Sequence, residues 1–127
     1  MHSHPDMETG RRNARQRTAV EFRRRLAEAR SRLLRTVART DDELTTLEVH
    51  QAGALTENSA RDTMAGLFER LEGRERHELD EIEVAQARLE SGRFGVCERC
   101  GEAIPLARLR AVPFTRHCRA CQAGEEC

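Results

Sequence analysis

The sequence predicts an all-α protein in which a long antiparallel coiled-coil hairpin is followed by a small C-terminal four-cysteine module. Three observations predict this fold class. Apolar residues recur at steps of three or four over two stretches, about residues 15–50 and 59–90, as one face of an amphipathic helix requires. Neither stretch contains a proline, which would interrupt a helix. Four cysteines then fall within residues 97–121.

The composition favours long solvated helices over a compact globule. Of the 127 residues, 38% are apolar, 3% are aromatic and 35% are charged. The 22 basic and 22 acidic residues cancel, so the net charge makes no case for binding to nucleic acid or to a membrane. No segment approaches the roughly 20 apolar residues of a membrane span, and no basic stretch precedes an apolar run near the N-terminus. We therefore expect a cytoplasmic protein.

The N-terminal segment, residues 1–14, is expected to be a disordered leader. Its first ten residues contain Pro5 and Gly10 and show no helical periodicity. The first helix of the hairpin is expected to follow and to end near residue 50. Within it, Thr40 and Glu43 form a capping-box pattern that could start a new helix, which indicates a kink near Thr40.

The chain is expected to reverse at a tip formed by about residues 51–58, so that the hairpin spans residues 15–91. Gly53 breaks the helical pattern, and Ser59 with Asp62 resembles a capping box at the start of the second helix. The second helix also contains Gly66 and Gly73, each of which should cost about 1 kcal/mol relative to alanine.

Charge indicates that the two helices run antiparallel. Residues 11–39 hold eleven arginines against two glutamates, whereas residues 69–90 hold four arginines against eight acids. Folding back at the tip brings these segments alongside each other, while a parallel pair would need a long crossover that the sequence lacks. Each exposed ion pair contributes at most about 1 kcal/mol, so the asymmetry informs the register more than the stability.

The four cysteines follow the pattern Cys-x2-Cys-x17-Cys-x2-Cys and are Cys97, Cys100, Cys118 and Cys121. This spacing lies in the range that places four thiolates around one tetrahedral zinc ion. The residues between the two pairs are too few for a core of their own, so metal binding would supply the folding energy. The sequence therefore predicts one structural Zn²⁺ in a module of residues 92–122, followed by a C-terminal tail, 123–127.

Other uses of the thiols are weaker predictions. A redox dithiol of the thioredoxin type would need a βαβ context that the sequence lacks. Four thiolates also close the coordination sphere, whereas a catalytic zinc keeps one position open for water. Without a Gly-rich phosphate loop or a recognisable nucleophile and base, we expect no enzyme. His117 is expected at the surface or beside the site, and Cys127 is expected to be a free thiol.

The segment between the cysteine pairs is expected to carry a short helix, from Pro105 to about Arg110 and ended before Pro113. Residues 93–121 contain six arginines and only two glutamates. No aromatic residues are interleaved for base stacking, which favours a solvated surface that meets an acidic protein over direct DNA binding.

The stretch LESGRFGVCERCGEAIPLARLRAVPFTRHCRACQ, together with the hairpin, resembles the DksA/TraR family of bacterial transcription factors over about residues 15–122. The most specific part is the run Phe-Gly-x-Cys-x-x-Cys-Gly-x-x-Ile at Phe94–Ile104. The run Arg-Leu-x-Ala-x-Pro follows at Arg108–Pro113. The resemblance implies a factor that binds RNA polymerase and inserts its coiled-coil tip into the secondary channel, toward the catalytic magnesium.

The tip departs from the family pattern. Family members carry two aspartates three positions apart, followed two positions later by an alanine. Counting back from Cys97 without gaps places Ala54, Glu57 and Ser59 at these positions. The changes should weaken polar interactions near a cationic active site, so we expect binding to polymerase to survive and the regulatory output to change or disappear. The alternative is that gaps in the hairpin shift the alignment and place other residues at the tip.

Three hypotheses of function follow, and the first is a transcription regulator that binds RNA polymerase. The second is a zinc-module protein that contacts DNA or another protein through a basic face, which consists of Arg108, Arg110, Arg116 and Arg119. The third is a thiol redox sensor that uses Cys118, Cys121 or Cys127, since zinc-bound thiolates can still be oxidised. Participation of guanosine tetraphosphate at the interface with polymerase stays open.

Overall fold

The computed structural model describes residues 5–51 and 58–124, with side chains from residue 16 to 49 and from residue 60 to 124. Within these ranges the regular structure is helical, apart from one antiparallel bridge between Val96 and Ala103. The helices, in chain order, are α1 (Pro5–Arg35), α2 (Asp41–Gln51), α3 (Asn58–Arg70), α4 (Gly73–Glu90), α5 (Leu106–Ala111) and α6 (Arg119–Gln122). The predicted all-α class is confirmed.

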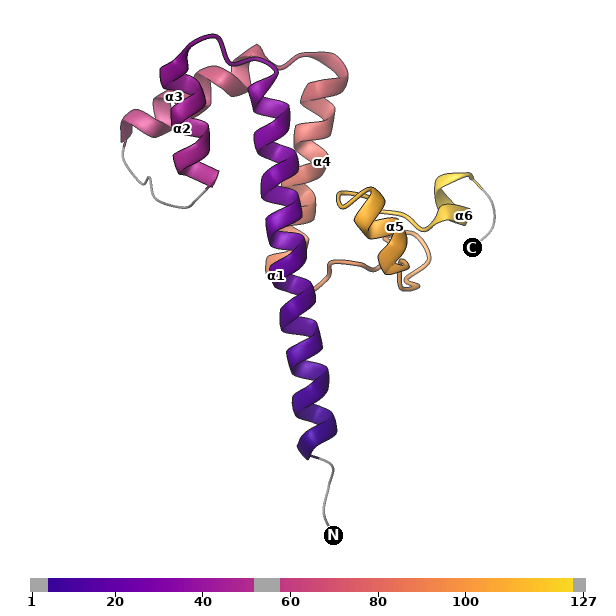
Figure 1. The fold of residues 1–127 in the computed structure, drawn as a ribbon. Helices are drawn as coiled ribbons and strands as arrows, with labels where there is room; N and C mark the ends of the chain where they lie inside the picture. Colours follow the sequence, from indigo (N-terminus) through magenta and orange to yellow (C-terminus); the bar gives the residue numbers. More distant parts are fainter. Residues whose placement is uncertain (1–4, 52–57, 125–127) are drawn as a thin grey trace.

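Helices α1 and α4 lie side by side and form the shaft of the hairpin (Figure 1). The inner faces of the helices meet in one cluster of buried residues, as the apolar periodicity predicts. Its members are Leu26, Leu33, Leu34, Leu47, Met64, Leu67, Leu71, Leu79, Ile82 and Ala85. Arg23 and Glu90, whose Nε and Oε1 atoms are 3.3 Å apart, join α1 to α4 near one end of this shaft. The antiparallel direction that the charges predict is therefore the observed one.

The long first helix that the periodicity predicts is interrupted between α1 and α2. The last turn of α1 tightens, because the N–H groups of Thr36 and Val37 donate to the carbonyls three residues before them. Thr40 then caps α2: its Oγ1 accepts from the N–H of Glu43 at 3.1 Å. In return, the Glu43 carboxylate accepts from the N–H of Arg39 at 2.9 Å. The capping pattern of the sequence is thus real, and it produces a full break in place of a kink.

The second long helix is also interrupted, at residues 71–72. Glu72 is extended, with φ −135° and ψ 156°, and Gly73 begins α4 with φ +56°. A positive φ is accessible to glycine at little cost, so Gly73 permits the turn between α3 and α4. The prediction that Gly73 lies in the interior of a helix is therefore wrong. Arg76 closes the end of α3 by donating to the Phe68 carbonyl at 2.8 Å.

The two breaks create an elbow, which we define as residues 36–40 and 71–72. Beyond it, α2 and α3 pack on each other as a short arm beside the upper end of the shaft (Figure 1). Arg70 ties the elbow together, since its Nη1 donates to the Val37 carbonyl at 3.1 Å and to Glu43. The hairpin is therefore bent, and the arm leaves the axis of the shaft.

The N-terminal segment differs from the expected leader, because α1 already begins at Pro5. Proline is favoured at a first helical position, where its missing N–H has no partner to lose. The N-terminal part of α1 continues past the end of α4 (Figure 1). Among the described residues, no helix has both the length and the apolar character needed to cross a membrane.

Candidate metal centre

The first cysteine pair lies on a tight turn after α4. The N–H of Gly101 donates to the Cys97 carbonyl at 2.9 Å, and the N–H of Cys97 donates to the Glu102 carbonyl at 2.8 Å. Gly101 has φ +78°, a left-handed conformation that glycine adopts at little cost. The turn holds Cys97, which is 1% exposed, and Cys100 toward the same side of the module.

The second pair lies at the start of α6. Cys118 occupies the N-cap position with φ −67° and ψ 167°, and its Sγ accepts from the N–H of Cys121 at 3.5 Å. The cap fixes the direction of Cys118, while the first turn of α6 presents Cys121 from the next position on the same side. Two turns that are separate in the sequence therefore present their thiols to one point.

The four Sγ atoms, those of Cys97, Cys100, Cys118 and Cys121, lie within 4.8 Å of one another. The Sγ atoms of Cys100 and Cys118 are 3.8 Å apart. Thiolates bound about 2.3 Å from one tetrahedral zinc ion are separated by about 3.8 Å, so the spacing suits one such ion. No histidine joins this group among the described residues, and His117 is therefore placed outside the converging ligand atoms.

The environment of the thiols favours a bound cation. Burial acts to raise the pKa of the Cys97 thiol, but the N–H groups of Cys100, Cys118 and Arg99 lower it to about 6. For Cys100, the N–H of Glu102 lowers the pKa, whereas burial and the neighbouring thiols raise it, and the net direction is upward. One thiolate is thus stabilised by the backbone, while further thiolates beside it repel one another unless a cation binds.

Zinc binding by these four cysteines requires each of them in its reduced form, because the thiolate is the metal ligand. Metal binding therefore depends on reducing conditions.

Residues 92–127 match the family model described as the prokaryotic dksA/traR C4-type zinc finger. The C-terminal module is a DksA/TraR zinc finger. The match agrees with the four converging cysteines, and it confirms the predicted zinc cofactor and the resemblance that the sequence showed. Four thiolates would fill the coordination sphere of the ion, which makes it a structural zinc that supplies folding energy to a module with little core.

Curated relatives match part of the chain. An uncharacterised protein of Aquifex aeolicus is 54% identical over 43 residues, which are 34% of this chain and 30% of that protein. The RNA polymerase-binding transcription factor DksA of Caulobacter vibrioides is 36% identical over 66 residues, 52% of this chain and 46% of that protein. The chain thus spans between about a third and a half of the length of these relatives.

A solved structure of a related chain is also similar to this protein. Transcription factor DksA2 from Pseudomonas aeruginosa aligns with a TM-score of 0.38 and 25% sequence identity. The alignment covers 89% of this chain and 78% of the DksA2 chain.

The zinc finger packs against α1 through Phe22, a contact that the sequence analysis missed. Phe22 is fully buried and shares a cluster with Cys97, Ile104, Leu109 and Cys121. Its ring also lies 5.0 Å from the ring of Phe94, centroid to centroid. The three- and four-residue periodicity of residues 15–50 includes Phe22 and predicts it only on the inner face of the hairpin. The scarcity of aromatic residues, with four phenylalanines and no tryptophan or tyrosine, was the one signal that could have singled it out.

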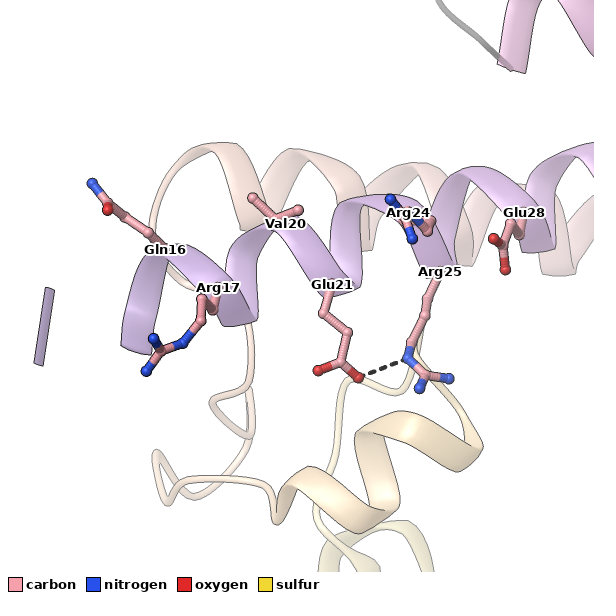
Figure 2. Close-up of a pocket in the computed structure, with 7 residues that line it drawn as sticks. All are labelled: Gln16, Arg17, Val20, Glu21, Arg24, Arg25 and Glu28. Atoms are coloured by element: carbon pink, nitrogen blue, oxygen red, sulfur yellow. Dashed lines mark hydrogen bonds and ion pairs between the residues drawn. The ribbon is translucent and has the colours of Figure 1, made fainter. Parts of the chain in front are cut away.

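Ion pairs add a second attachment of the zinc finger to α1. Arg110 binds the Glu21 carboxylate with two hydrogen bonds, of 2.8 and 3.1 Å. Arg25 binds the same carboxylate at 2.8 Å, as the dashed line in Figure 2 marks. The hydrogen bonds from Arg110, and then from Arg25, lower the pKa of Glu21 to about 2. A single carboxylate on α1 therefore holds one arginine of the zinc finger.

A third attachment joins the zinc finger to α4. Arg116 binds Glu98 within the zinc finger at 3.0 Å and Glu81 of α4 at 3.2 Å. Arg88 of α4 also pairs with Glu98 and donates to the Val96 carbonyl at 2.6 Å. These contacts attach the zinc finger to α4. Together with the contacts of Phe22 and Glu21, they hold it against both helices of the shaft.

The predicted basic face is largely engaged within the chain. Arg110 and Arg116 bind carboxylates, and the Nε of Arg108 donates to the His117 carbonyl at 3.2 Å. Three of the four arginines that the sequence analysis assigned to an external partner therefore serve to hold the module together.

The predicted tip residues are not tested by this structure. Ala54 and Glu57 lie outside the described residues, while Ser59 belongs to α3, with its side chain outside them. The structure shows only that α2 ends at Gln51 and that α3 begins at Asn58.

Proposed function

We propose that this chain is a non-enzymatic transcription regulator that binds RNA polymerase. The observation that carries the proposal is the DksA/TraR zinc finger at residues 92–127. The similarity extends beyond that module, since 66 residues are 36% identical to the RNA polymerase-binding factor of Caulobacter vibrioides. In this proposal the zinc finger is a structural base, and the helical arm is the part that enters the secondary channel of the polymerase.

The attachments of the zinc finger support a bracing role. Phe22 fixes the module on α1, and Arg116 fixes it to Glu81 of α4. Because four thiolates leave no open position on the zinc ion, the metal would not bind a substrate. The base of the hairpin is therefore rigid, which suits a protein that must hold the tip of its arm at a defined position.

The arm provides the probe in this proposal. A pair of antiparallel helices is about the thinnest self-supporting helical object that a protein can form, and α2 with α3 is such a pair. The segment between them, with Ala54, Glu57 and the adjoining Ser59, would lie nearest the catalytic magnesium. Only Glu57 offers a carboxylate there, so we expect it to be the main polar contact.

A nucleic-acid function has less support. Phosphate binding needs arginine side chains that are not engaged in ion pairs within the protein. Arg110 and Arg116, however, already bind carboxylates of the same chain. Displacing them would undo the attachment of the zinc finger to the shaft. Duplex DNA binding that falls steeply with salt would nevertheless favour this alternative over the proposal.

The direct test is co-purification of the reduced, zinc-loaded protein with core RNA polymerase in the absence of promoter DNA. We expect a stoichiometric complex for the wild-type protein and for Glu57→Ala. In transcription assays, with and without guanosine tetraphosphate, we expect Glu57→Ala to change the amount of transcript. The control is Glu72→Ala, which removes an exposed carboxylate at the elbow and should leave the amount of transcript unchanged. If the wild-type protein forms no complex with the polymerase, the proposal is wrong.

A further inference from the structure

One face of α1 carries a row of alternating charges, which we call the charged row. It consists of Arg17, Glu21, Arg24 and Glu28, at spacings of 4, 3 and 4 positions. At about 100° per residue, this spacing keeps the four side chains within an arc of about 60° on the helix. Val20 lies on the same face and is 56% exposed, although it is apolar. Figure 2 shows these side chains along α1.

Most of the charged row is exposed to solvent. It borders an open surface region whose lining residues all belong to α1. Arg17, Arg24 and Glu28 are exposed. Beyond this row the N-terminal part of α1 runs past the end of α4, so a second helix can approach along the axis (Figure 1).

The order of the charges makes this row complementary to a reversed copy of itself. Its spacing reads the same in both directions, while the signs read plus, minus, plus, minus in one direction and the opposite in the other. A two-fold axis between residues 22 and 23 therefore places Arg17 opposite Glu28 of a second copy. The same axis places Glu21 opposite Arg24 of the second copy. A parallel pair in register would instead set like charges against each other.

We propose that two copies of this chain associate through antiparallel α1 helices along the charged row. The two-fold symmetry forms each ion pair twice, which gives four across the interface. Glu21 can take part while it holds Arg110, because its side chain is still 29% exposed and a carboxylate has about four acceptor positions. The symmetry also sets Val20 opposite Arg25 of the second copy, whose aliphatic stem can cover it.

The energetics predict a weak, salt-sensitive dimer. Exposed ion pairs contribute little individually and are screened at high ionic strength. The apolar content of the row is limited to Val20, so the interface has no hydrophobic centre to support it when the charges are screened. Association should therefore be detectable at low salt and at protein concentrations from about 10 μM to about 1 mM.

Charge reversal gives a specific test with two single variants, Arg17→Glu and Glu28→Arg. Each places like charges opposite each other in its own homodimer, and we expect each to weaken association about tenfold in sedimentation velocity at low salt. An equimolar mixture of the two variants restores complementarity in a heterodimer. The double variant, which carries both changes, restores it in a homodimer.

The expected pattern is association of the wild-type protein, of the mixture and of the double variant, with weaker association of each single variant alone. Zinc content and far-UV circular dichroism confirm that each variant is folded, and the double variant provides a second measurement if one single variant is not. A wild-type protein that stays monomeric at low salt would overturn the proposal. So would a mixture that associates no better than its components.

Discussion

Arg70, the last residue of α3, binds Glu43 in the first turn of α2 with Nη1 2.7 Å from Oε2, although 27 residues separate the two in sequence. The same Nη1 donates to the carbonyl of Val37, in the first break of the hairpin. Arg70 itself directly precedes the second break. This pair therefore holds the two breaks of the hairpin next to each other and sets the direction of the arm relative to the shaft.

Acid is expected to weaken the elbow. The Arg70 guanidinium, together with the N–H of Arg39, lowers the pKa of Glu43 from 4.5 to about 2. A carboxyl whose pKa falls on folding stabilises the folded state above its ordinary pKa, and this contribution is lost as the pH falls from 4.5 toward 2. Glu43→Gln should therefore lower the thermal midpoint at neutral pH and flatten its decline across that range, measured by circular dichroism.

The control for this prediction is Glu48→Gln, which removes an exposed carboxylate from the same helix. Glu21 also has its pKa lowered to about 2, so the wild-type decline includes its contribution. The difference in thermal midpoint between the wild-type protein and Glu43→Gln, at each pH, therefore gives the contribution of Glu43 at the elbow. Identical pH profiles for these two proteins would show that Glu43 does not stabilise it.

Two glycines of the second helical segment should respond to alanine in opposite directions. Gly73→Ala is expected to lower the free energy of unfolding by about 1 kcal/mol, because φ is +56° there. Gly66→Ala is expected to raise it by about 0.5–1 kcal/mol, since the residue is inside α3 and an added Cβ meets nothing within 4 Å. Urea unfolding measures both, and a stabilised Gly73→Ala would argue against the break at residues 71–72.

Loss of one cysteine should release the metal and unfold only the zinc finger. For Cys97→Ser or Cys118→Ser, we expect zinc to fall from one ion per chain to none under reducing conditions, while α1 to α4 stay helical. Elemental analysis, circular dichroism and limited proteolysis report these effects. Cys127→Ser is the control and should keep its zinc. Stoichiometric zinc and full protease resistance in either ligand variant would disprove the assigned set of four.

Truncation of Phe22 should detach the zinc finger from the shaft. Phe22→Ala is expected to cost about 3–5 kcal/mol, since a fully buried aromatic side chain leaves a cavity between α1 and the module. Proteolysis between α4 and α5 should become faster, with zinc retained. Val20→Ala changes an exposed position on the same helix and serves as the matched control. Equal proteolysis of both variants would mean that Phe22 does not hold the module in place.

Local patterns predicted the features of this protein that depend on neighbouring residues. Three- and four-residue periodicity predicted helices, because one apolar face recurs at each turn. The spacing of Cys97 and Cys121 with their partners predicted the thiol cluster, because metal ligands must lie on tight turns. Thr40 and Glu43 predicted a helix start, because a cap involves only residues within one turn.

Contacts between distant residues could not be predicted in the same way. The burial of Phe22 in the zinc finger depends on where residues 94–121 fold back, which no local pattern specifies. The pairing of Arg110 with Glu21 joins positions 89 residues apart. The role of Gly73 depends on its φ, which is set by the packing of α3 and α4 on either side of the break. The sequence therefore shows that these residues are present, but it does not predict which of them contact each other.

The central claim is that the arm of this chain enters the secondary channel of RNA polymerase, and a crosslinking map tests it most directly. A photoreactive amino acid at position 57 would be activated in the complex with core polymerase, with position 72 at the elbow as the reference. The account predicts crosslinks from position 57 to the channel wall near the catalytic magnesium. Crosslinks from position 57 only to the outer surface of the polymerase would contradict it.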